Sequence, residues 1–129
     1  MAHWHGISRR KSSGGRLKRP SSYRGKRRTE IASEKQFTMI GEPSRKNYRK
    51  RAGSQTVRVL YDSIVNVADK KTGKVIQATL QSVSENAADP NFVRRNIMTK
   101  GAVVETDKGL VRITSRPGSH GVINGVLLE

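Results

Sequence analysis

Apolar and polar residues alternate along much of the second half of the chain, which predicts short β-strands. In one such segment Ile76, Ala78 and Leu80 share one face, while polar residues occupy the positions between them. A period of two residues places successive side chains on opposite faces of a strand, so each segment can bury one face. Strands are expected at residues 57–67, 75–83, 102–106, 110–114 and 121–128.

Turn-forming residues separate these segments. Residues 69–74 read Asp-Lys-Lys-Thr-Gly-Lys, with Gly73 able to supply a positive φ, and residues 107–109 read Asp-Lys-Gly. Several short strands joined by such turns are typical of a small β-barrel. The fold class is therefore predicted as mainly β, with a small closed or nearly closed barrel over residues 54–129.

Residues 84–100 interrupt the strand pattern. Pro90 lacks an N–H donor and biases the residue before it away from helix, so residues 86–90 are predicted as a loop. Residues 91–98 are expected to form one or two helical turns, from which Arg94 and Arg95 protrude beside apolar neighbours. This arginine pair is either a solvated surface or a second anion-binding patch on the folded domain.

The first 53 residues have no sustained period. Glycines and prolines interrupt them repeatedly, and apolar residues are scarce, with 13 here against 30 in residues 54–129. They hold sixteen basic and three acidic residues, a net charge of +13, whereas residues 54–129 carry +3. Residues 1–53 are therefore predicted to be a basic, largely irregular arm that becomes ordered on a polyphosphate backbone.

The amino-acid composition limits the class of binding partner. The chain has 129 residues and a net charge of +16, which favours a polyanion, with RNA or DNA ahead of an anionic membrane. No apolar run approaches the length of a membrane span, and a basic run follows residues 1–7 where a secretory signal would be apolar. Neither a recognition helix nor a zinc finger is visible, so folded RNA fits better than duplex DNA.

Catalytic and cofactor motifs are not found in the sequence. The absence of cysteine excludes disulfides, thiolate zinc sites and thiol nucleophiles. His3 and His5 make a weak metal site without a third ligand, and Ser119 beside His120 does not constitute a triad without an orienting acid. We therefore expect no enzyme activity, catalytic residue, metal, cofactor or small-molecule substrate.

Two glycine-containing segments suit a phosphate. Residues 12–16 place Gly14 and Gly15 beside Arg16, and residues 115–118 place Arg116 beside a proline and a glycine. Glycines allow backbone N–H groups to approach an anion, and arginine can grip it with two hydrogen bonds; both segments could also be ordinary turns. Aromatic residues of the arm can stack on unpaired bases: Trp4, Tyr23, Phe37 and Tyr48. For Trp4 and Phe37 the alternative is that they pack back onto the barrel.

Most of the predicted RNA-binding residues are lysines or arginines of the arm, of the insertion at residues 84–100 or of residues 115–118. The others lie near such a residue in the sequence. The full set is Trp4, His5, Arg9, Arg10, Lys11, Gly14, Gly15, Arg16, Lys18, Arg19, Arg24, Lys26, Arg27, Arg28, Arg45, Lys46, Arg49, Lys50, Arg51, Arg94, Arg95 and Arg116.

Several blocks, in this order, resemble the ribosomal protein S8e family in its short archaeal form. They are Trp-His-Gly-Ile-Ser-Arg-Arg-Lys at 4–11, Ser-Gly-Gly-Arg at 13–16, Val-Arg-Arg-Asn at 93–96, Thr-Lys-Gly-Ala at 99–102, Thr-Ser-Arg-Pro-Gly at 114–118 and Gly-Val-Ile-Asn-Gly-Val-Leu at 121–127. The resemblance implies a structural protein of the small ribosomal subunit, with a β-barrel and basic extensions on rRNA. Residues 24–42 match the family loosely, and Arg51-Ala52-Gly53 stands where it usually has Arg-Gly-Gly.

The sequence thus predicts a non-catalytic protein that binds small-subunit rRNA and neighbouring small-subunit proteins, on ribosomes in the cytoplasm and without a membrane. The alternative is an assembly factor or RNA chaperone that is not part of the mature particle, because its basic arm would look the same.

Overall fold

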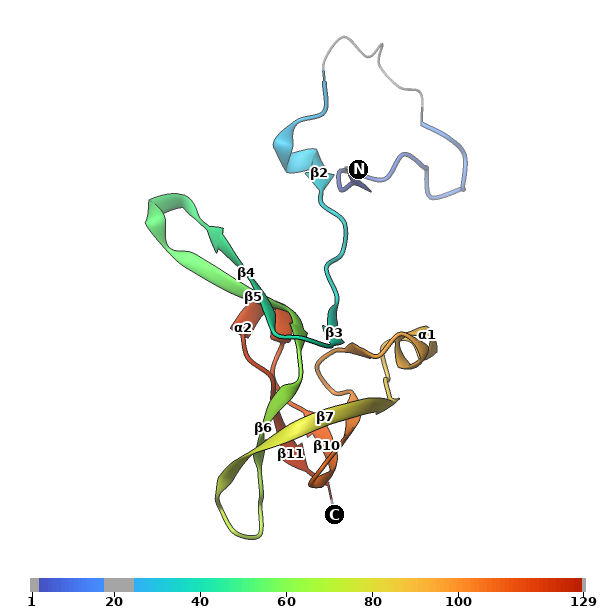
Figure 1. Cartoon of the computed structure of the whole chain (residues 1–129). Helices are drawn as coiled ribbons and strands as arrows, with labels where there is room; N and C mark the ends of the chain where they lie inside the picture. The colour runs from blue at the N-terminus through green and yellow to red at the C-terminus, as the bar shows by residue number, and fades with distance from the viewer. Residues whose placement is uncertain (1–2, 18–24, 129) are drawn as a thin grey trace. The chain divides into compact units, whose positions relative to one another are not determined.

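The computed structural model describes residues 3–17 and 25–128, in two compact units divided after Lys35 (Figure 1). Among these residues, no helix has the length and apolar character needed to cross a membrane.

The second unit contains a closed five-stranded barrel, which confirms the predicted β-barrel. Neighbouring strands follow the order β10-β11-β6-β7-β9 and close back on β10; only β11 and β6 run parallel. The strand bounds are β6 Ile64–Ala68, β7 Val75–Glu85, β9 Val103–Thr106, β10 Gly109–Ile113 and β11 Asn124–Leu127. Closure leaves these strands without an unpaired edge along their paired lengths.

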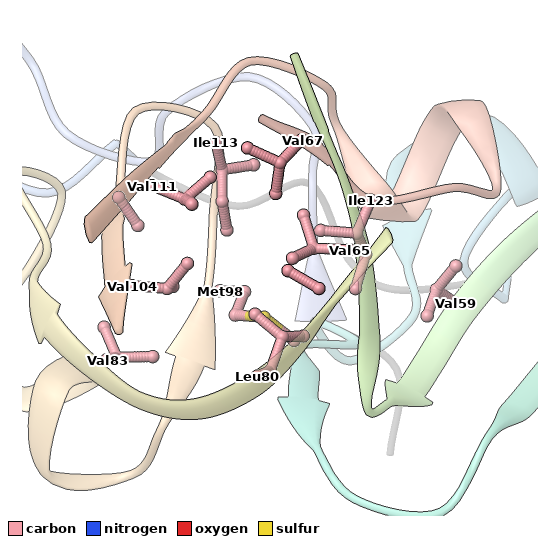
Figure 2. Close-up of a cluster of buried hydrophobic side chains, with 12 residues drawn as sticks. Val59, Val65, Val67, Leu80, Val83, Met98, Val104, Val111, Ile113 and Ile123 are labelled. Atoms are coloured by element: carbon pink, nitrogen blue, oxygen red, sulfur yellow. The ribbon is translucent and has the colours of Figure 1, made fainter. Parts of the chain in front are cut away.

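Aliphatic side chains fill the barrel, as Figure 2 shows. Val65 and Val67 on β6 and Val111 and Ile113 on β10 are at most 1 % exposed, which is the alternation expected of strands with one buried face. Val104 from β9 belongs to the same buried cluster. Most of these side chains are β-branched, and such residues pack well on a pleated surface.

Strand β7 is long enough to pair with β6 at one end and with β9 at the other. Its register shifts between Leu80 and Ser82, so that Val83 rather than Ser82 is buried. A bulge of this kind bends a strand and re-aims the following side chains. Ile76, predicted on the buried face with Ala78 and Leu80, is instead 39 % exposed near the end of the β6–β7 hairpin.

A four-stranded sheet, in the order β4-β5-β3-β8, belongs to the same unit. Its strands are β3 Thr38–Ile40, β4 Ser44–Arg49, β5 Gln55–Asp62 and β8 Ile97–Met98. The buried Thr38 hydroxyl donates to the Val59 carbonyl at 2.7 Å, which ties the short β3 to β5. Strands β3 and β4 thus lie within residues 1–53, which were expected to be largely irregular, and they belong to the unit that begins at Gln36.

The remaining elements are short. In the second unit, α1 Pro90–Arg94 supplies one of the helical turns predicted over residues 91–98, but it begins at Pro90, which was expected in a loop, and Ile97–Met98 form strand β8 instead. Helix α2 Pro117–His120 makes one turn where a loop was expected, and η2 Arg51–Gly53 lies at the β4–β5 turn. In the first unit, η1 Arg28–Glu30 leads into β2, and β1 pairs with β2. The bounds of this pair are β1 His3–Trp4 and β2 Ile31–Ala32.

Candidate nucleic-acid interface

The β4–β5 hairpin is the most basic element of the second unit. Residues 44–58 contain six lysines and arginines and no acidic residue. In Figure 1 the hairpin loop projects away from the barrel strands. The six side chains are exposed, and they belong to Arg45, Lys46, Arg49, Lys50, Arg51 and Arg58. Cations concentrated on a projecting element form the electrostatic footprint expected of a nucleic-acid-binding surface.

A tight turn holds the tip of this hairpin. The Lys50 N–H donates to the Ser54 carbonyl at 2.7 Å, and the Gly53 N–H donates to the Lys50 carbonyl at 3.2 Å. Ala52 and Gly53 have φ values of +64° and +80°, the left-handed region that glycine adopts without cost. The turn exposes Lys50 and Arg51 side by side at the end of the hairpin.

One face of the hairpin gathers two cations around a tyrosine. Lys46 and Arg58 lie directly opposite each other on β4 and β5. The Lys46 Nζ lies 5.4 Å, and the Arg58 Cζ 4.8 Å, from the centroid of the Tyr48 ring. The Tyr48 hydroxyl in turn donates to the Gln36 Oε1. This hydrogen bond and the two cations hold the half-buried ring in place.

The opposite face of the hairpin is used for packing. Helix α2 packs against β5, and a Cβ on Gly121 would come within 3.0 Å of the Val57 Cβ. Gly121 therefore allows the close approach that seats α2, and its φ of +74° suits glycine as well. Arg45 on this side donates to the buried Asp62 carboxylate at 3.3 Å, so its charge is partly neutralised.

A second basic hairpin lies in the first unit. Arg10 and Arg16 pair across it, and the Lys11 N–H donates to the Gly15 carbonyl at 2.8 Å. The Gly14 N–H donates to the Lys11 carbonyl at 2.9 Å, and Gly14 has a φ of +85°. Gly14 thus uses its amide to make the turn, which agrees with the ordinary-turn alternative for this segment. Its carbonyl accepts from the Arg10 Nη1 at 2.9 Å.

Trp4 is held by residues close to it in the chain. Its indole Nε1 donates to the Ile7 carbonyl at 3.2 Å, and the Arg9 Cζ lies 4.3 Å from a ring centroid. The His5 N–H donates to the Glu30 carbonyl at 2.7 Å, which joins this segment to η1. The predicted contact residues of η1 and its approach are exposed: Lys26, Arg27 and Arg28.

Arg94 and Arg95 are exposed at the end of α1, as predicted. The Asp89 carboxylate accepts from the Asn91 N–H at 2.8 Å and caps this helix, and Pro90 occupies its first position. Arg95 lies with its Cζ 5.7 Å from the Phe37 ring, which packs on Phe92 at a centroid distance of 5.1 Å. Phe37 therefore packs within the second unit, one of the two alternatives for this residue.

Arg116 is also exposed, and its backbone N–H donates to the His120 Nδ1 at 3.1 Å. His120 thus closes the turn of α2, which gives this histidine a structural role. Within the described part of the chain, no group of three or more His, Cys, Asp or Glu could hold a metal ion. The predicted contacts Lys18, Arg19 and Arg24 lie outside the described residues, as does Tyr23.

The predicted contact residues do not include Arg58, which lies opposite Lys46 on the β4–β5 hairpin. Alternation with Val57 and Val59 does place Arg58 on the face opposite these valines, and this signal could have identified it. In the β6–β7 turn, Asp69 accepts from the Lys71 N–H and the Thr72 hydroxyl, both at 2.8 Å. These bonds, the Lys71 N–H first, lower the pKa of Asp69 because they stabilise its carboxylate.

Residues 4–128 match the family model described as ribosomal protein S8e. The chain belongs to this family. It is 50 % identical over 126 residues, covering 98 % of each chain, to a protein of Methanocorpusculum labreanum named small ribosomal subunit protein eS8. It is 49 % and 47 % identical over 126 residues, again covering 98 % of each chain, to proteins of that name from Methanospirillum hungatei and Methanosphaerula palustris. The resemblance in the ordered sequence blocks is thereby confirmed.

Proposed function

We propose that this protein is a structural constituent of the small ribosomal subunit, acts in translation without catalysing a reaction, and binds small-subunit rRNA. The observation that carries the RNA-binding part is the β4–β5 hairpin, with six cations and no acid over residues 44–58. The membership of the S8e family and the names of its archaeal relatives support the ribosomal part.

The barrel and the basic segments have different roles: the barrel provides the stable core, and the basic segments contact RNA. The barrel buries the apolar side chains and anchors the hairpin, because β5 leads directly into the corner at which β6 begins. The hairpin, residues 9–16, the η1 region, α1 and Arg116 supply the cations that neutralise phosphates where rRNA helices crowd together. Neighbouring small-subunit proteins are further partners, and the site of action is the cytoplasmic ribosome.

Sedimentation of cell extracts tests the ribosomal assignment. A stoichiometric constituent stays with small subunits on a sucrose gradient after a moderate salt wash. An assembly factor or chaperone instead leaves mature particles and follows precursor particles, and this outcome would favour the alternative function.

Equilibrium binding to transcribed small-subunit rRNA tests the RNA contact itself. If roughly 6–10 phosphates are engaged, the affinity falls about 10³–10⁵-fold between about 50 and 200 mM salt, because each contact releases a condensed counterion. A flat response to salt would contradict the phosphate-based mechanism.

A further inference from the structure

We propose that Lys46 and Arg58 jointly bind one backbone phosphate of RNA, and that Tyr48 is a positioning residue which holds both cations rather than a platform for base stacking. This inference rests on the proposed function, since it specifies how one face of the β4–β5 hairpin contacts RNA.

The first argument is the placement of like charges. Lys46 and Arg58 are a directly opposed cross-strand pair. Side chains at such positions have Cβ atoms about 4.5–5.5 Å apart, and like charges there destabilise the strand pair. No acidic residue occurs within residues 44–58 to offset the repulsion. An anion placed between the two cations relieves it, so the free hairpin is arranged for an anionic ligand.

The second argument is the arrangement around Tyr48. Both cationic groups contact its ring, with the Arg58 Cζ and the Lys46 Nζ at 4.8 and 5.4 Å from the centroid. The hydroxyl is bonded to Gln36. A ring that already attracts two cations offers less free surface to a base, and it fixes two long side chains that would otherwise lose conformational freedom on binding. Tyr48 therefore acts through its neighbours.

The third argument is that the two faces of the hairpin differ. Val59 on the other face is 1 % exposed, and Val57 packs against the α2 end at Gly121. Arg45 is engaged by Asp62. Within the described residues, Lys46 and Arg58 have no carboxylate partner. RNA thus approaches the hairpin from the Lys46 side.

The chemistry of the pair favours phosphate over a protein carboxylate. Arginine presents a planar fork that matches phosphate oxygens, and lysine adds a compact point charge beside it. Protein interfaces, by contrast, are depleted in lysine and have an apolar centre. On this face Lys46 and Arg58 are exposed, and the neighbouring cross-strand pair, Tyr48 and Thr56, is half-buried.

The test uses the full chain and transcribed small-subunit rRNA, with the affinity measured over a series of salt concentrations. The variants are Lys46→Ala, Arg58→Ala, the double variant, Tyr48→Ala and Tyr48→Phe. The matched control is the double variant Lys70→Ala/Lys74→Ala, which removes the same charge from exposed positions at the β6–β7 hairpin. Circular dichroism and thermal unfolding verify that each variant folds.

A shared phosphate predicts a specific pattern of slopes. The slope of log affinity against log salt changes by about 0.7–0.9 for each phosphate lost. We expect each single variant to lose at most about this amount, and the double variant to lose no more than about 0.9. The double variant binds about tenfold more weakly at low salt, in line with the loss of charge-assisted hydrogen bonds. The control keeps the wild-type slope.

Different outcomes would overturn the proposal in different ways. A slope loss of about 1.4–1.8 in the double variant means that two phosphates are bound separately. An unchanged RNA slope together with weaker binding of poly-glutamate means an acidic protein partner. If wild type and control bind RNA with a steep salt dependence while the double variant matches them, only this inference fails. If wild type shows no salt-dependent binding, the proposed function fails with it.

The tyrosine variants separate positioning from stacking. Tyr48→Phe keeps the ring and is expected to bind as wild type does. Tyr48→Ala keeps both charges but frees their side chains, so it is expected to weaken binding at low salt by up to about tenfold while most of the wild-type salt slope remains. The ratio of affinities for poly(A) and poly(U) stays unchanged in both. A ratio that changes on Tyr48→Ala would mean that the ring stacks on bases, because purines stack more strongly than pyrimidines.

Discussion

The Asp62 carboxylate lies 3.3 Å from the Arg45 guanidinium, at the corner where β5 ends and β6 begins. The same carboxylate accepts the N–H groups of Ser63 and Ile64 at 2.9 and 3.2 Å. Asp62 is only 4 % exposed, so these bonds are formed largely out of water. One side chain thus shapes the corner of the backbone and fastens the base of the basic hairpin to the barrel.

Replacing this carboxylate is expected to weaken the fold. Asp62→Ala leaves two backbone N–H groups without their partner, which costs about 1–3 kcal/mol. Urea unfolding of wild type and Asp62→Ala measures the difference in the free energy of unfolding. Lys108→Ala, which removes one partner of the exposed Lys108–Asp107 pair at 3.7 Å, is the control and changes stability by less than about 1 kcal/mol. Equal effects of the two variants would contradict a structural role for Asp62.

Ala52 occupies a position that suits glycine. Its φ of +64° places the Cβ in the left-handed region, where a non-glycine residue is strained by about 1–2 kcal/mol. Glycine removes that strain but has more entropy to lose on folding, so Ala52→Gly is expected to raise the free energy of unfolding by about 0.5–1 kcal/mol. Thermal unfolding measures the change. A lower Tm would show that the turn is not strained.

Gly125 is needed where β11 pairs with β10. A Cβ at this position would lie 2.3 Å from the Val111 Cγ1 and 3.0 Å from the Arg112 carbonyl oxygen. Gly125→Ala is therefore expected to force the barrel apart and to cost about 1–3 kcal/mol. Gly118→Ala is the matched control, because a Cβ there meets nothing within 4 Å. Denaturant unfolding measures the free energy of unfolding of both variants. The loss in Gly125→Ala beyond that in Gly118→Ala is the cost of crowding the added methyl group.

The lowered pKa of Asp69 predicts a pH-dependent contribution to stability. The contribution is fully present above the unfolded-state pKa, near the ordinary value of 3.8, and is lost as the pH falls through the lower folded-state pKa. Asp69→Asn removes the charge, so its Tm deficit relative to wild type should shrink below about pH 4. Thr72→Ala removes one donor and should move the pKa of Asp69 upward, as followed by NMR titration. A deficit that grows on acidification would contradict this assignment.

The barrel could be predicted from sequence because its strands bury one face. Residues such as Val111 and Ile113 alternate with exposed positions, and turns such as 69–74 contain glycine at a positive φ. Both signals are visible in a single sequence, because burial of one strand face requires alternating apolar residues and a positive φ favours glycine. The exposure of the arginines at the end of α1 could be anticipated because helical turns were predicted after Pro90. That Asp89 caps the helix and Pro90 is its first residue was not predicted.

The β4–β5 hairpin could not be predicted in this way. Five of the six residues from Ser44 to Arg49 are exposed, so neither face leaves an apolar period in the sequence. Its pairing depends on β5, whose own pattern was visible but whose partner was not. The Lys46–Arg58 pair follows only from the register of the two strands, and its cations are far apart along the chain. The charge count predicts the kind of partner, and the sheet register is the observation from which we propose the place of contact.

A cross-linking map of assembled small subunits tests the central claim most directly. Formaldehyde cross-linking followed by mass spectrometry identifies the peptides of this chain that are attached to rRNA. We predict rRNA cross-links within residues 44–58 and 9–16, with the cross-link at Lys46 lost in Lys46→Ala. Cross-links confined to the β6–β7 turn, or made only to proteins, would contradict the account.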